Sequence, residues 1–142
     1  MNQLQTDISG QILKAYYLVY SRLGFGFKEN VYENAMVIEL VKQGLYCTLQ
    51  RPLNVFYDEM NVGKCFAEII VNEQIILEVR SRDMINTEDE EQLLNYLRAT
   101  EIEIGMLLNF GKEPQYRSRF LMNNLKTMIR QPITRSDKEL EN

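Results

Sequence analysis

Two glutamates lie in segments whose other residues are mostly apolar, where a soluble core does not place a lone carboxylate. Glu68 lies within residues 66–71 and Glu78 within residues 75–80. Burying an ionised carboxylate is costly unless it is paired or bound to a metal. If the two carboxylates converge, a divalent cation relieves their repulsion, and ligation by oxygen alone is what Mg²⁺ or Mn²⁺ prefers. These residues therefore point to metal-dependent chemistry.

The turn between the two segments decides whether these carboxylates meet. Side chains alternate along a strand, so Glu78 and Arg80 share one face and Val79 lies on the other. We predict that Glu68 faces Glu78 across a hairpin with an odd-numbered loop, because neither carboxylate has another evident partner. A two-residue loop would put them on opposite faces. The alternative is an ion pair of Glu78 with Arg80 or Arg82 at the edge of a sheet.

The composition excludes several other kinds of active site. The 142 residues are predicted to form one domain, residues 1–142, with an ordinary globular content of 45% hydrophobic and 25% charged residues. The chain has no histidine, which removes Ser-His-Asp and Cys-His catalysis and the histidine ligands of most catalytic zinc. Cys47 and Cys65 lie in apolar segments and are expected to be reduced, partly buried thiols. Chemistry must rest on carboxylates, Lys, Arg, Tyr or a hard metal.

The sequence carries no sign of a membrane partner. No apolar run reaches the ~18 residues needed to span a bilayer, and the first residues lack a basic segment followed by an apolar one. We therefore expect a cytoplasmic protein, and the oligomeric state, a homodimer included, stays open.

The charges are unevenly distributed along a chain whose net charge is -4. Residues 83–103 are strongly acidic, whereas residues 112–135 hold six basic residues and one acidic residue. This basic region could contact the phosphates of a nucleic acid. An ordinary solvated surface is the simpler explanation, because runs of like charge are usually exposed.

The hydrophobic pattern predicts an α/β fold. Apolar residues recur every three or four positions over residues 8–23 and again over residues 29–43, and Gly24 and Gly44 follow these stretches. This pattern predicts a hairpin of two helices. Short β-prone runs follow and predict an antiparallel meander, at residues 46–50, 53–57, 62–71 and 74–80.

A third helix and a further strand are expected after the meander. Thr87 and Glu90 form a capping-box pattern, so the helix is expected to begin at Thr87 and to end near Ala99. Residues 102–110 read as a buried strand, which gives a mixed sheet with helices on both faces. A turn follows at residues 111–114, residues 120–129 form a strand or a short helix, and the tail at residues 132–142 is expected to fray.

Four motifs of the chain, in this order, resemble one known family. Residues 26–32 match the pattern GxxExxY, residues 67–71 and 77–80 stand where that family has its metal-binding Asp and its Glu-x-Lys, residues 92–96 resemble its QxxxY helix, and residues 104–110 resemble the strand that follows. Over residues 5–122 the chain is therefore similar to the GxxExxY protein family, which belongs to the PD-(D/E)XK nuclease superfamily.

The resemblance implies a metal-dependent phosphodiesterase site that holds Mg²⁺ or Mn²⁺. Its metal ligands would be two carboxylates, a backbone carbonyl and a helix carboxylate acting through water, namely Glu68, Glu78, Val79, and Glu29 or Glu33. Its other catalytic residues would orient the attacking water and position a phosphate, namely Arg80, Gln92 and Tyr96. The structural alternative is that Glu29 complements a helix N-terminus and that Gln92 and Tyr96 pack between elements.

Two departures from the family pattern bear on activity. The usual Asp is Glu68 here, which is one methylene longer, and the usual Lys is Arg80. A guanidinium holds phosphate well but does not act as a general base. We expect a slow metal-dependent nuclease. The alternatives are an inactive nuclease-fold module that binds nucleic acid or a protein partner, and a protein-interaction scaffold without a nucleic-acid role.

Overall fold

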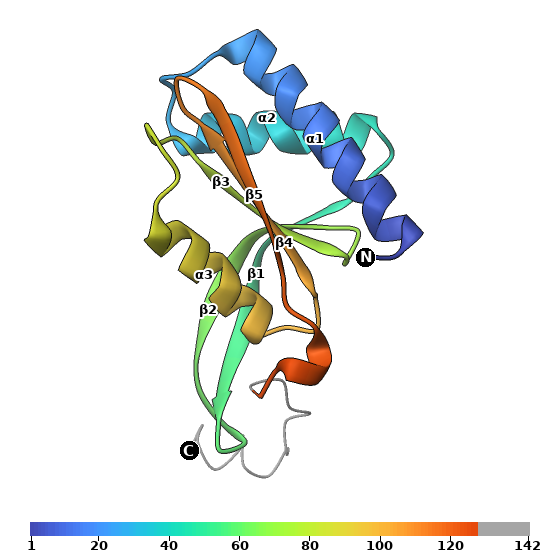
Figure 1. Ribbon diagram of the computed structural model, residues 1–142, viewed down its shortest axis with the longest axis vertical. Coiled ribbons are helices and arrows are strands. Elements are labelled where there is room, and N and C mark those ends of the chain that lie inside the picture. Colours follow the sequence, from blue (N-terminus) through green and yellow to red (C-terminus); the bar gives the residue numbers. More distant parts are fainter. Residues whose placement is uncertain (128–142) are drawn as a thin grey trace.

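The computed structural model describes residues 1–127 and has helices on both faces of one sheet (Figure 1). Helices α1 (Gln3–Leu23) and α2 (Glu29–Lys42) pack on one face, and α3 (Thr87–Arg98) packs on the other. The predicted α/β fold, with a mixed sheet flanked by helices, is confirmed. Within residues 1–127 no helix is long and apolar enough to cross a membrane.

The helix hairpin begins and ends close to the predicted positions. Asn2 caps α1 by accepting a hydrogen bond from the backbone N–H of Gln5. Gly24, just after α1, has a φ of 67°, and Gly44, two residues after α2, has a φ of 84°. Such positive φ values favour glycine, so these two glycines stop the helices as the sequence predicts.

The sheet has five strands in the spatial order β1-β2-β3-β4-β5. Their bounds are Cys47–Tyr57 for β1, Met60–Val71 for β2, Ile75–Arg80 for β3, Ile104–Phe110 for β4 and Pro114–Phe120 for β5. Strands β3 and β4 are parallel and are connected through α3, whereas the other neighbours are antiparallel. The parallel pair brings the carboxyl ends of β3 and β4, at Arg80 and Asn109, side by side.

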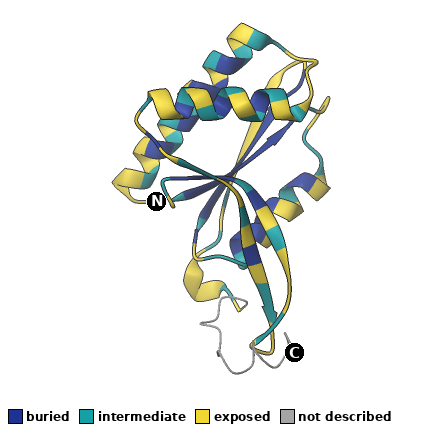
Figure 2. Cartoon of the chain, turned by 180° about the vertical axis from the view of Figure 1, so that it is seen from behind, coloured by how far each residue is buried: buried dark blue, intermediate teal, exposed yellow. Residues whose placement is uncertain are grey.

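Strand β3 is buried on both faces, as the dark central strands in Figure 2 show. Leu77 and Val79 belong to the core under α1 and α2, and Ile76 belongs to the core under α3. The two charged residues of β3 are buried as well, with exposed fractions of 1% for Glu78 and 7% for Arg80. Because water cannot solvate them there, both charged groups need partners inside the protein.

The meander has three strands rather than the four predicted. The runs at 46–50 and 53–57 form one strand, β1, in which Pro52 pairs with Phe66. Pro52 is tolerated because β1 is an edge strand, where a missing N–H need not break the ladder. Gln50 has a φ of 50°, which marks an irregularity in the strand at the position where the sequence pattern suggested a break.

The C-terminal part of the fold differs from the prediction. A fifth strand, β5, begins at Pro114, the last residue of the predicted turn at 111–114. It was not predicted, because its side chains are mostly exposed and form no apolar run. Of the element predicted at residues 120–129, the described part holds the last residue of β5, Phe120, and a short 3₁₀ helix at Asn123–Leu125. The tail expected at residues 132–142 lies outside the described residues.

Candidate active site

The β2–β3 hairpin brings Glu68 and Glu78 together. Its register pairs Ile69 with Leu77, Ile70 with Ile76 and Val71 with Ile75, and leaves a three-residue loop at 72–74. One step further along this register places Glu68 opposite Glu78, and the backbone N–H of Glu68 donates to Oε1 of Glu78 at 3.4 Å. The predicted odd-numbered loop and facing carboxylates are confirmed.

The guanidinium of Arg80 occupies the space between these carboxylates. Its Nη1 lies 2.6 Å from Oε2 of Glu68, 2.8 Å from the carbonyl oxygen of Val79 and 3.5 Å from Oε2 of Glu78. One nitrogen therefore contacts atoms from all three residues that the family resemblance makes direct metal ligands. The alternative of a Glu78–Arg80 pair at a sheet edge is half right, since the pair exists but lies on a central strand.

Asp89 binds the Nε atom of Arg80. It is a site residue that was not predicted from the sequence. The carboxylate of Asp89 is 3% exposed and accepts hydrogen bonds from Nε of Arg80 at 3.1 Å and from Nε of Arg82 at 2.6 Å. Helix α3 is capped by Asn86, which accepts from the backbone N–H of Asp89, rather than by Thr87 as predicted. Asp89 thus sits in the first turn with its side chain aimed at the two arginines.

A signal for Asp89 was present in the sequence. Asp89 precedes the buried residues Leu93, Tyr96 and Leu97 by four, seven and eight positions, so it lies on the buried face of α3. A carboxylate on such a face needs a buried partner. The arginines that follow Glu78 were the available cations.

Burial and mutual repulsion set the charges of the carboxyl groups. Burial, together with the neighbouring Glu68, raises the pKa of Glu78 to about 10 and that of Glu33 to about 8. Burial acts in the same direction on Glu68, but hydrogen bonds from Glu78, Glu33 and Arg80 hold its pKa below the usual value. At neutral pH Glu68 is therefore the ionised member of the three, and Arg80 balances its charge.

The remaining predicted residues lie around this cluster. Glu29, in the first turn of α2, acts on Glu33 and Arg82 through its charge. On the α3 face of the sheet, which Glu78 and Arg80 share, Gln92 donates a hydrogen bond to the hydroxyl of Tyr96, and burial raises the pKa of Tyr96. Both line an open groove of about 430 Å³ together with Val55, Cys65 and Asn95. Their catalytic roles stay predictions.

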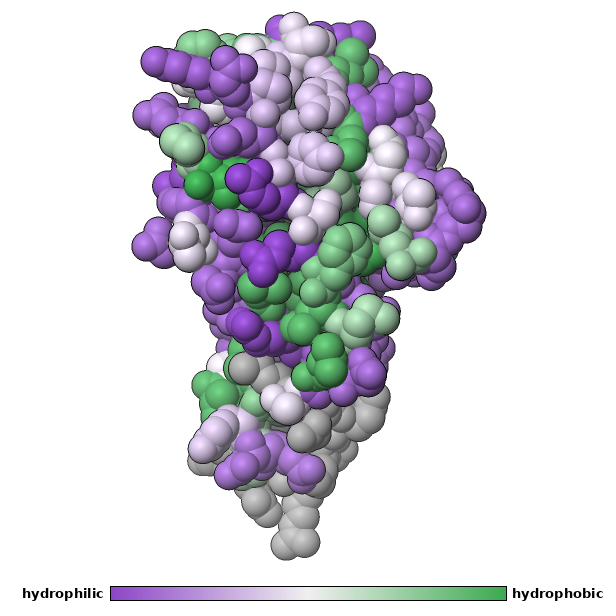
Figure 3. All heavy atoms as spheres, in the orientation of Figure 1, coloured by the Kyte–Doolittle hydropathy of each residue, from purple (hydrophilic) through white to green (hydrophobic). Residues whose placement is uncertain are grey.

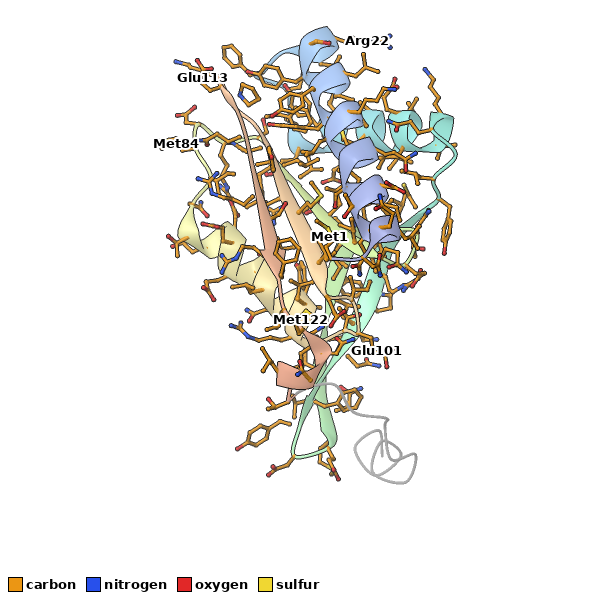
Figure 4. The ribbon with its side chains drawn as sticks, turned by 45° about the vertical axis from the view of Figure 1, so that its right-hand side comes forward. Met1, Arg22, Met84, Glu101, Glu113 and Met122 are labelled. Atoms are coloured by element: carbon orange, nitrogen blue, oxygen red, sulfur yellow. The ribbon has the colours of Figure 1, made fainter. Side chains whose placement is uncertain are left out.

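The end of the sheet that carries Arg80 is marked in Figure 4 by Met84, in the loop after β3, and by Glu113, in the β4–β5 turn. Asn109 ties this loop to β4. Its buried side chain accepts a hydrogen bond from the backbone N–H of Arg82 and donates one to the carbonyl of Arg82, both at 2.9 Å. The chain that follows Arg80 is therefore fixed by the neighbouring parallel strand.

The donor atoms fit a divalent cation only in part. Among residues 1–127 no group of three or more Cys, Asp or Glu side chains is gathered so that it could hold a metal ion. However, Oε1 of Glu68 and Oε2 of Glu78 are buried and accept no hydrogen bond from an N–H group or a hydroxyl. A buried acceptor without a partner is costly, and two such oxygens beside a backbone carbonyl suit a hard cation. The set fits once the guanidinium of Arg80 moves aside.

The Tyr of the GxxExxY motif has a structural role. The hydroxyl of Tyr32 donates to the carbonyl of Gly24 at 2.8 Å and accepts from the backbone N–H of Phe27 at 3.2 Å. Its ring stacks on Phe110, with centroids 4.2 Å apart. Tyr32 therefore fixes the loop between α1 and α2, and so the start of the helix that carries Glu33.

Replacing Tyr32 with Phe is expected to destabilise the fold by about 1 to 2 kcal/mol, because the ring stacking remains and only the two hydrogen bonds are lost. Urea unfolding measures the difference. Tyr46→Phe is the matched control, since Tyr46 is exposed. An unchanged unfolding free energy in Tyr32→Phe would contradict the structural role.

The basic region is described only up to residue 127, and part of its charge is used within the fold. Lys126 donates to the carbonyls of Thr100 and Ile102, and burial lowers its pKa to about 8. Arg119 pairs with Glu90. Figure 3 shows apolar side chains gathered on the face that carries β5 in Figure 1. Phe120, Met122 and Leu125, at the end of β5 and just after it, are exposed. A nucleic-acid contact by residues 112–135 stays a prediction.

The fold and the cluster together define a class of protein. A mixed sheet flanked by helices, with two facing carboxylates and a basic residue two positions after the second, is the arrangement of a nuclease-like domain. The sequence model of the PD-(D/E)XK nuclease superfamily matches residues 6–120, and the chain belongs to that superfamily. Its nucleases generally use divalent metals. Comparisons with curated proteins and with solved structures gave no match.

Proposed function

We propose that this protein is a slow, metal-dependent phosphodiester hydrolase that acts on nucleic acid, and that it falls in the GxxExxY branch of its superfamily. The observation that carries the proposal is the pair of facing carboxylates, Glu68 and Glu78, each with one buried oxygen that accepts no hydrogen bond from an N–H group or a hydroxyl. The superfamily match supports a nucleic-acid substrate. A location in the cytoplasm is part of the same proposal.

The residues divide into ligands and positioning groups. Glu68, Glu78 and the carbonyl of Val79 would hold Mg²⁺ or Mn²⁺, with Glu33 or Glu29 linked to it through water. When bound, such an ion polarises a phosphodiester and activates the attacking water. The protein's own part is to orient that water and to stabilise the charge that develops on the phosphate, which suits the fork of donors on Arg80.

Gln92 and Tyr96 would position the substrate. They line an open groove on the α3 face, and Tyr96 lies close enough to Glu78 for the two side chains to interact electrostatically. Tyr96 is buried, and its hydroxyl accepts a hydrogen bond from the amide of Gln92, which is exposed beside the groove. These residues would therefore hold a nucleotide next to the carboxylates rather than take part in proton transfer.

Thermal melts with and without millimolar Mn²⁺ test the metal site. We expect Mn²⁺ to raise the melting temperature of the wild type, because an ion that binds only the folded state stabilises it by mass action. Glu78→Ala should lose the shift. Cleavage of labelled DNA and RNA, with Glu78→Ala as the blank, tests the activity. A wild type without a shift, or a Glu78→Ala variant with an equal one, would rule out this metal site.

The second candidate is a nuclease-fold module that binds nucleic acid or a protein partner without cleaving it. The observation in its favour is that Arg80 already neutralises Glu68 within the fold. Binding of labelled DNA and RNA as a function of salt separates the candidates, since contacts with phosphates release counterions and give a steep salt dependence. Absence of any nucleic-acid binding would favour a protein-interaction scaffold.

A further inference from the structure

We propose that the guanidinium of Arg80 is the resident cation of the carboxylate site and competes with a divalent metal for the same oxygens. The site then has two occupants that exclude each other, and Arg80 controls metal entry. This inference rests on the proposed function only in taking Glu68 and Glu78 as the ligands of the ion.

The inner contacts of Arg80 support the competition. Nη1 contacts Oε2 of Glu68 at 2.6 Å and the carbonyl of Val79 at 2.8 Å, and it lies 3.5 Å from Oε2 of Glu78. A metal ion that used these atoms would lie within van der Waals contact of Nη1. Since both species are positive and the site is buried, they cannot occupy it together.

The guanidinium of Arg80 has a second partner, on helix α3. Its Nε is held by Oδ1 of Asp89 at 3.1 Å, on the side away from Glu68 and Glu78. This contact can persist when Nη1 leaves the carboxylates. The carboxylate of Asp89 is held in position by Arg82, and the backbone N–H of Asp89 donates to the capping residue Asn86. Arg80 therefore has two hydrogen-bonded carboxylate partners. A metal ion can take over Glu68, whereas it does not need Asp89.

The competition lowers the affinity for metal rather than abolishing it. Metal entry must break a buried hydrogen bond between two ionised groups, and breaking such a pair is unfavourable unless the incoming ion replaces it. The ion would take the place of Nη1 on Oε2 of Glu68, and it would also satisfy Oε2 of Glu78, which accepts no hydrogen bond. Because the lost Arg80–Glu68 hydrogen bond offsets part of the binding free energy of the ion, the concentration of free metal decides whether Arg80 or the ion holds the carboxylates.

Binding of Mn²⁺ to the whole, metal-free protein tests the proposal. The free ion is counted by its electron paramagnetic resonance signal, which does not depend on activity. We expect Arg80→Met to bind Mn²⁺ at least about tenfold more tightly than the wild type, a difference of about 1.4 kcal/mol. Arg82→Met is the matched control, because Arg82 also pairs with Asp89 but forms no ion pair with Glu68 or Glu78. Its affinity should change less than twofold.

Arg80→Gln is a second variant for the same measurement, to be used if Arg80→Met does not fold. The amide of Gln is neutral, so the gain in Mn²⁺ affinity should be similar, and it can still donate a hydrogen bond toward Glu68. The double variant Arg80→Gln with Glu78→Gln should lose the gain, which would place the ion at these carboxylates. Equal Mn²⁺ affinity in the wild type and Arg80→Gln, or the same gain in Arg82→Met, would overturn the proposal.

The outcomes for this inference and for the proposed function are separable. If Arg80→Gln binds Mn²⁺ tightly but no variant cleaves DNA or RNA, Arg80 is the competing cation and the hydrolase is wrong. If the wild type cleaves and binds Mn²⁺ as tightly as Arg80→Gln, the hydrolase stands and the competition is wrong.

Discussion

Replacing Arg80 with Lys, together with Glu68 by Asp, is expected to raise metal-dependent cleavage of a labelled DNA or RNA at least about tenfold. Arg80 stays charged. Burial lowers the pKa of its guanidinium, but the hydrogen bonds with Glu68 and Asp89, together with the charges of Glu68 and Glu78, raise it by more. A lysine in the same buried place can lose its proton, so it can relay a proton from water and no longer opposes a metal ion. General acid–base assistance is typically worth about 10² to 10⁴ in rate.

Initial rates with Mg²⁺ and with Mn²⁺ measure this effect, and Glu78→Ala supplies the blank. Glu68→Asp alone is the control for the shorter carboxylate, and it should change the rate less than the double variant does. Fast cleavage by the wild type that Arg80→Lys abolishes would contradict the prediction and make Arg80 a phosphate clamp. Cleavage by no variant would favour the binding module.

The positions of Glu68, Glu78 and Arg80 on the sheet were predictable, because they follow from the alternation of side chains along a strand and from the register of one hairpin. Alternation along β3 puts Glu78 and Arg80 on one face, and the loop at 72–74 is the odd-numbered one that brings Glu68 opposite Glu78. Asn72 and Glu73 both have positive φ, at 51° and 56°. Asn often adopts this conformation and Glu rarely does, so the turn residues alone did not settle the length of the loop.

The contacts of Arg80 were not predictable in the same way. Its long side chain can reach Glu68, Glu78 or Asp89, and the choice among them depends on where α3 packs. The packing of α3 depends in turn on the parallel pairing of β3 with β4, which joins residues far apart in the sequence. Strand β5 was missed for a related reason, since it is held by its pairing with β4 rather than by an apolar pattern.

Replacing Glu78 with Gln is expected to stabilise the metal-free protein, and increasingly so as the pH rises. Burial and Glu68 raise the pKa of Glu78 from its ordinary 4.5 to about 10. Between these values the folded state keeps a proton that the unfolded state has released, so the unfolding free energy of the wild type falls with increasing pH. Gln does not titrate. The gain of Glu78→Gln should therefore grow by on the order of 4 kcal/mol between pH 5 and pH 8, since one proton differs over nearly three pH units at about 1.4 kcal/mol each.

Urea unfolding in the presence of EDTA measures this gain, and Glu73→Gln on the same hairpin is a control of opposite sign. Hydrogen bonds from Arg51 lower the pKa of Glu73, so its contribution is present above the unfolded pKa and is lost as the pH falls. Glu73→Gln should thus lose up to about 1 kcal/mol at pH 8, since the pair is partly exposed. If the gain of Glu78→Gln did not change with pH, Glu78 would be ionised in the folded state. Glu68 and Glu78 would then share the single positive charge of Arg80, and the raised pKa of Glu78 would be wrong.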